Sequence, residues 1–163
     1  MKILTHDESC KIWNRIYEEF RFTPDVDIKN KAFVIKQHHV IYDISKMTKE
    51  QKSAIEDTVN SLFAKLVGTE GLLYALDWQH SDFLFNPGKD ERFEYINVKD
   101  EDFGEYRAYF PTYYPNGDYY FFINEDFSFG YLSHPWQEKV WIFGEKLIEE
   151  FSLIEKQLGW SKL

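Results

Sequence analysis

Residues 113–123 read YYPNGDYYFFI, a turn dipeptide set between two aromatic runs. Asn-Gly accepts the two positive φ angles of a type I′ turn, and aromatic residues favour strands. The stretch therefore predicts a β-hairpin in which strands near residues 105–113 and 118–123 pair antiparallel. Residues 124–126 (NED) predict the next turn, and residues 127–132 (FSFGYL) predict another strand.

Two helices are predicted from capping motifs followed by apolar residues at helical spacing. Thr5 with Glu8 matches a capping box and starts a helix over roughly residues 6–20. Thr48 with Gln51 matches a second one, ahead of Ile55, Val59, Leu62, Phe63 and Leu66.

A third helix is predicted after Pro135, which suits a first helical position, with Ser133 or His134 as its cap. Gly68 and Gly159 are expected to end the second and third helices, Gly68 as a left-handed cap. The apolar face of the third helix is expected to comprise Val140, Phe143, Leu147, Ile148, Phe151 and Ile154, with Gly144 allowing close approach.

The remaining segments predict strands and loops. Residues 31–45 suggest two short strands joined by a polar turn at 37–39, and residues 72–78 and 83–85 suggest two more. Residues 86–104 are expected to form a long, charged surface loop. The order predicts an α+β fold in one domain, with a mainly antiparallel sheet of about five to seven strands packed by three helices.

Composition excludes several classes of protein. The 163 residues carry 19 Lys+Arg against 28 Asp+Glu, a net charge of −9, which argues against a nucleic-acid partner. Aromatic residues make up 19%, too much packing material for a disordered acidic chain. The sequence has no run approaching the roughly 18 apolar residues of a membrane span and no signal peptide, so a cytoplasmic protein is expected.

Nucleotide-binding loops and nucleophile elbows are absent from the sequence, and no cofactor is predicted. The single cysteine, Cys10, is expected to be a buried or half-buried side chain rather than a nucleophile. His38 and His39 are expected to be solvated in their turn.

Two polar segments are candidates for chemistry. Residues 76–80 (LDWQH) end a predicted strand, with Trp78 and His80 expected on one face and Asp77 and Gln79 on the other. His134 lies at the predicted strand-to-helix junction, where free N–H groups favour an anion.

If these segments are neighbours, Asp77, His80 and His134 form either a metal-binding set or an acid/base pair for a hydrolase. No metal is predicted outright, because the spacing matches no ligand signature and each histidine can serve simply as a hydrogen-bonding residue.

Residues 90–126 mix acidic and aromatic side chains. This block is interpreted either as a solvated surface or as a docking surface for a basic protein, in which aromatic anchors supply affinity and negative charge speeds encounter. The residues predicted to contact such a partner are Trp78, Gln79, Trp136, Glu101, Asp102 and Asp118.

The C-terminal two thirds resembles an uncharacterised family of Gram-positive bacteria and their phages, domain of unknown function 2716. The residues that carry the resemblance are LDWQH at 76–80, NGDYY at 116–120, residues 126–130, and HPW at 134–136 followed by Phe143-Gly144. The family commonly has glycine at the position of Ser133 and aspartate at that of Asn116. The resemblance implies a small intracellular bacterial or prophage protein and transfers no catalytic residue.

The leading hypothesis is therefore a non-enzymatic protein-binding module of immunity or anti-defence type, of undetermined oligomeric state. The alternatives are a small hydrolase or metal-dependent enzyme with an Asp/His pocket, and a self-associating structural protein.

Overall fold

The computed structural model describes residues 1–27, 29–89, 91–101 and 103–163. Its helices are α1 (His6–Phe20), α2 (Lys49–Val67) and α3 (Glu145–Ile154), with a 3₁₀ turn at Pro87–Lys89. The strands within these residues are β1 (Lys2–Ile3), β2 (His39–Asp43), β3 (Leu73–Asp77), β4 (Phe83–Phe85), β5 (Tyr95–Asp100), β6 (Gly104–Tyr109), β7 (Tyr120–Asn124), β8 (Gly130–His134), β9 (Lys139–Phe143) and β10 (Ser161–Lys162).

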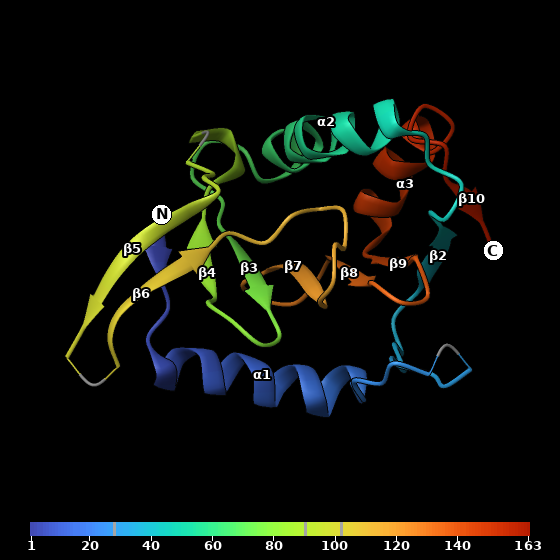
Figure 1. Cartoon of the computed structure of the whole chain (residues 1–163). Helices are drawn as coiled ribbons and strands as arrows, with labels where there is room; N and C mark the ends of the chain where they lie inside the picture. Colours follow the sequence, from blue (N-terminus) through green and yellow to red (C-terminus); the bar gives the residue numbers. More distant parts are fainter. Residues whose placement is uncertain (28, 90, 102) are drawn as a thin grey trace.

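Eight strands form one antiparallel sheet in the order β1-β4-β3-β7-β8-β9-β2-β10, and β5 pairs with β6 in a separate two-stranded sheet. The helix α1 lies along one face of the large sheet, and α2 and α3 cover the other (Figure 1). The predicted α+β class and antiparallel sheet are confirmed, with more strands than expected.

The large sheet is buried on both faces, which explains its dense aromatic runs. Phe121 and Phe122 are adjacent in β7, and both are fully buried. Phe121 packs in the cluster on the α1 side with Ile16 and Phe20, whereas Phe122 packs on the α2 side with Phe63. Since side chains alternate along a strand, a strand covered on both sides reads as continuously apolar.

The first two helices begin where their capping boxes predict. Thr5 and Thr48 each accept a hydrogen bond from the third helical N–H, and the Glu8 and Gln51 side chains bond back to the cap backbone. Gly68 ends α2 with φ 70° but ψ −165°, outside the left-handed helical region expected. No helix in the described part of the chain is long and apolar enough to cross a membrane.

The hairpin predicted at Asn116-Gly117 is wrong. Gly117 has φ 135°, but Asn116 does not take the positive φ that a type I′ turn also needs. The strand β7 pairs with β3 and β8, because its two buried faces belong in the middle of the large sheet. The strand predicted at 127–132 begins later, as β8 at Gly130, after a turn.

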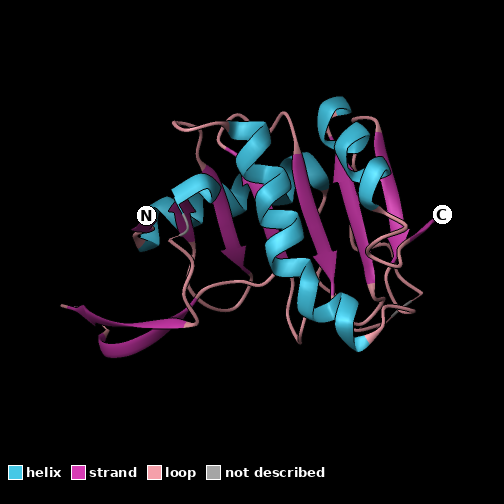
Figure 2. Cartoon of the chain, turned by 90° about the horizontal axis from the view of Figure 1, so that it is seen from above, coloured by secondary structure: helices cyan, strands magenta, loops and turns pink. Residues whose placement is uncertain are grey.

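The strand that precedes Asn116-Gly117 along the chain, β6, pairs with β5 instead of β7. The strand β5 lies within residues 86–104, which were predicted to form a long charged loop. Ile96 and Val98 alternate with exposed residues in β5. This period-two pattern is typical of a strand, but the charged residues around it favoured the prediction of a loop. The two strands form an arm, defined here as residues 95–101 and 103–109, that projects from the rest of the protein (Figure 2).

The last helix begins ten residues later than predicted, at Glu145 rather than Pro135. Residues 135–138 form a turn, and residues 139–143 form β9, between β8 and β2 in the large sheet. The run VWIF has four apolar residues in a row, and this continuous pattern of a fully buried strand outweighs the helical spacing of Val140 and Phe143. The helix ends at Ile154, before Gly159.

Residues 31–45 contain one strand, β2, rather than two. Residues 31–36 form no strand, yet Phe33 and Ile35 are buried on the α1 side of the sheet. The segment is held by backbone hydrogen bonds between Thr23 and Ala32 (2.9 Å) and between Val34 and Phe20 (2.7 Å). Residues 31–36 thus cover part of the core without joining the sheet.

Candidate functional site

Asp77 and His80 lie together in the turn that follows β3. Oδ1 of Asp77 accepts a hydrogen bond from the Gln79 N–H (3.2 Å) and lies 3.0 Å from Nδ1 of His80. The Asp77 carboxylate is buried, whereas 58% of the His80 side chain is exposed. An aspartate at the end of a strand often closes a turn in this way, and here the turn brings the imidazole onto the carboxylate.

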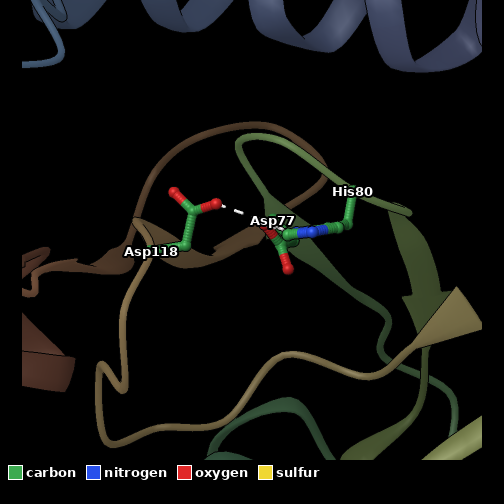
Figure 3. A group of neighbouring side chains, drawn as sticks. All are labelled: Asp77, His80 and Asp118. Carbon is green, nitrogen blue, oxygen red and sulfur yellow. Dashed lines mark hydrogen bonds and ion pairs between the residues drawn. The ribbon is translucent and has the colours of Figure 1, made fainter.

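Asp118 joins this pair from the segment before β7, and the three side chains form the cluster drawn in Figure 3. Oδ2 of Asp118 lies 3.7 Å from Nδ1 of His80. The pairing of β3 with β7 places Asp77 opposite Tyr120, which brings the start of β7 beside the turn after β3. Asp118 was predicted to lie on a docking surface, but its side chain is buried. Pairing residues 76–80 with residues 116–120 in the sequence would have indicated that Asp118 lies near Asp77 and His80.

Burial raises the pKa of Asp77 to about 6. The contact with His80 acts in the opposite direction, whereas the negative charge of Asp118 raises this pKa further. Burial also raises the pKa of Asp82 to about 6. The Asp82 carboxylate accepts hydrogen bonds from Nε1 of Trp13 (2.9 Å) and from the Asp77 N–H (3.1 Å). Three buried carboxylates, those of Asp77, Asp82 and Asp118, therefore lie near the end of β3 in space.

A cavity of about 960 Å³ opens beside the cluster, between the start of α1, the β3–β4 connection and the arm. His80 and Asp82 line it from the β3–β4 connection, His6 from α1, and Tyr106 and Arg107 from the arm. This volume is in the range of small-molecule sites. The exposed side of the His80 ring thus faces a space that could hold a ligand.

The structure does not bring His134 into this cluster. His134 is fully buried in β8, with Nε2 3.2 Å from the Tyr119 hydroxyl. That hydroxyl donates to the Asp25 carbonyl (2.8 Å), so Nε2 of His134 carries the proton, while Nδ1 accepts from the Gln137 N–H (3.2 Å). Burial, helped by the charge of Lys139, lowers the pKa of His134 to about 4.

The helix N-terminus expected at residues 133–136 is absent, so the anion site predicted there has no basis. Trp136 is 40% exposed in the β8–β9 turn, and its ring lies 5.4 Å from that of Tyr119. His38 is exposed and lies 2.7 Å from Oε1 of Glu145, and His39 begins β2 rather than lying in a turn.

The other predicted contact residues are spread over the surface. Trp78 is half-buried and donates its indole N–H to the Tyr17 hydroxyl (2.9 Å). It lies with His80 in the turn after β3, so the strand faces expected for these residues do not apply. Gln79 is exposed and lines the cavity. Glu101 is exposed near the tip of the arm, and Asp102 lies outside the described residues.

Cys10 is exposed, with Sγ 3.5 Å from Nε2 of His6 one helical turn earlier. The prediction of a buried or half-buried thiol is therefore wrong. The first turns of α1 carry this side chain on the solvent face, since the buried positions of that helix are Ile16 and Phe20.

The fold and site define a three-layer α+β protein with a carboxylate-histidine cluster beside a cavity. The chain belongs to the family described as Protein of unknown function (DUF2716), whose model matches residues 3–148. The match extends the resemblance noted for the C-terminal two thirds into the first helix and strands. The chain is 30% identical to the Uncharacterized protein YxiI of Bacillus subtilis (strain 168), over 91% of its own length and 90% of that protein. No solved structure matches significantly.

Proposed function

We propose that the chain is a non-enzymatic protein-binding module, of immunity or anti-defence type, that docks a basic protein through its arm. The observation that supports this most is the arm itself. Its strands pair with each other and, within the described residues, with no strand of the large sheet. Ile96, Val98 and Ala108 pack against the core, but the rest of the arm is costly to order unless it contacts something else.

The arm carries aromatic side chains that the fold leaves exposed. Phe103, near its tip, is 71% exposed, and Tyr95 and Tyr109 are a partly exposed cross-strand pair with ring centroids 5.7 Å apart. Exposed aromatic residues of this kind are typical anchors in protein interfaces. They supply apolar contact area at little cost in side-chain entropy.

Negative charge surrounds these anchors. Residues 94–109 include two basic residues, Lys99 and Arg107, and five acidic ones, Glu94, Asp100, Glu101, Asp102 and Glu105. With a net charge of −9 for the whole chain, the arm would attract a cationic partner and speed its encounter.

Charge reversal in the arm tests this proposal. The tagged chain is first used to recover a basic protein from its own cells. The double variant Glu101→Lys with Glu105→Lys is then expected to slow association with that protein by about tenfold at low salt, and far less in 0.5 M salt. Surface plasmon resonance at both salt concentrations measures the effect.

The matched control is Glu18→Lys with Glu149→Lys, which makes the same change in net charge at exposed positions of α1 and α3. Its effect on the association rate should be clearly smaller. Equal rates for both variants, or no basic protein recovered with the tagged chain, would count against the arm as the docking surface.

A second candidate, a small hydrolase or metal-dependent enzyme, is supported by the contact between Asp77 and His80. A buried carboxylate on Nδ1 holds the imidazole with Nε2 free to take a proton. Because His80 lines the cavity, a water beside a bound substrate could be activated there. Asp77 would orient the ring and His80 would act as the base.

Replacing His80 by alanine separates this candidate from a structural role. Turnover of a panel of ester and phosphoester substrates should vanish in His80→Ala, with a melting temperature within about 2 °C of the wild type, since the ring is mostly exposed. His38→Ala, at another exposed histidine, should retain activity. A large fall in melting temperature for His80→Ala would instead show that the ring holds the turn together.

A further inference from the structure

The cluster after β3 has a charge imbalance. Asp77 and Asp118 are both buried, and the group between them is the single imidazole of His80. Among the described residues, no lysine or arginine forms an ion pair with either carboxylate. Burying two carboxylates against at most one positive charge is unfavourable unless another cation balances them.

Asp118 also has an oxygen that contacts the His80 ring at 3.7 Å but receives no hydrogen bond from the described residues. Its Oδ1 accepts from the Tyr119 N–H at 2.7 Å. Its Oδ2 accepts no hydrogen bond from the described part of the chain, although more than nine tenths of the side chain is buried. The Asp118 carboxylate points toward Asp77 and His80 (Figure 3), so the oxygen is held toward the centre of the cluster.

We infer that Asp77, His80 and Asp118 bind a divalent transition-metal ion, with Zn²⁺ or Mn²⁺ preferred to Mg²⁺ or Ca²⁺. One atom from each side chain lies within 4.8 Å of the other two. Ligands about 2.0–2.1 Å from a tetrahedral ion lie roughly 3.3 Å from one another. The separations of 3.0 and 3.7 Å from Nδ1 of His80 bracket that value.

The donor set decides the preference among ions. An imidazole nitrogen with two carboxylate oxygens suits the borderline ions, whereas Mg²⁺ and Ca²⁺ favour oxygen ligands alone. Three protein ligands leave at least one position for water or a bound molecule. This inference deepens the second candidate function, but it concerns binding alone and is tested without any substrate.

Calorimetric titration of the chelator-treated full chain with Zn²⁺ and with Mn²⁺ tests the site. One ion per chain is expected, together with a rise in melting temperature. Asp118→Asn and His80→Asn should each weaken binding at least tenfold and remove most of that rise. Without metal, Asp118→Asn should melt at or above the wild-type temperature, since it removes a buried charge.

Cys10→Ser is the matched control, because His6 and Cys10 form an exposed pair that could capture zinc on its own. This variant should keep one tight site. Absence of binding, binding unchanged in His80→Asn and Asp118→Asn, or loss of binding only in Cys10→Ser would each overturn the assignment. His80→Asn, at a largely exposed side chain, keeps the test decisive even if Asp118→Asn fails to fold.

Discussion

Gly144→Ala is expected to lower the free energy of unfolding by about 3 to 5 kcal/mol. Gly144 lies between β9 and α3 with φ 94°, a conformation that residues with a side chain rarely adopt. A Cβ there would lie 2.4 Å from Cβ of Phe129 and 2.9 Å from the Ser128 carbonyl oxygen. Because both contacts involve a Cβ or a backbone atom, no side-chain rotation relieves them.

Gly104→Ala provides the comparison. Gly104 also has a positive φ, 76°, but a Cβ there meets nothing within 4 Å. Its replacement should cost only about 1 kcal/mol, the conformational part alone. Urea denaturation of both variants measures the difference, and equal losses would show that steric contact at Gly144 contributes little.

The second large effect is a pH dependence that belongs to His134. Its pKa is lowered to about 4 in the folded chain, against about 6.5 unfolded, so the unfolded state takes up the proton first as the pH falls. The stability that His134 contributes is present above pH 6.5 and is lost on acidification toward pH 4. By linkage, the loss is about 2 to 3 kcal/mol between pH 7.5 and 4.5.

The total stability curve would conceal this effect. Asp77 and Asp82, whose pKa values are raised, contribute in the opposite sense, since they are easier to protonate in the folded state as the pH falls through 6. The measurement is therefore the difference in unfolding free energy between the wild type and His134→Gln. That difference should shrink by about 2 to 3 kcal/mol between pH 7.5 and 4.5; a constant difference would contradict the buried neutral histidine.

Local signals in the sequence predicted the elements that depend on local interactions. The capping boxes at Thr5 and Thr48 act within four residues, so the starts of α1 and α2 followed from the sequence. The third helix was misplaced because Val140 to Phe143 satisfies a helical spacing and a buried strand equally well. Only the neighbouring strands β8 and β2 decide in favour of the strand.

The candidate site shows the same division between local and long-range structure. Asp77 and His80 were grouped from the sequence together with His134, although strand alternation put them on opposite faces. The strand ends at Asp77, and the turn after it brings the two side chains into contact. Asp118 comes from 41 positions beyond Asp77, through the pairing of β3 with β7, which the sequence did not predict. His134 was proposed from its place at an expected strand-to-helix junction, whereas the aromatic packing that buries it depends on the whole sheet.

The two outermost strands of the large sheet are only two residues long, and each carries a lysine: β1 with Lys2 and β10 with Lys162. A chain so rich in strands and aromatic residues would otherwise offer long open ladders for copies of itself to extend. Short edge strands that carry a lysine disfavour such extension of the sheet, because a second chain finds few backbone groups to pair with and must approach a positive charge. The few residues in β1 and β10 thus leave the large sheet little free edge for pairing with another copy.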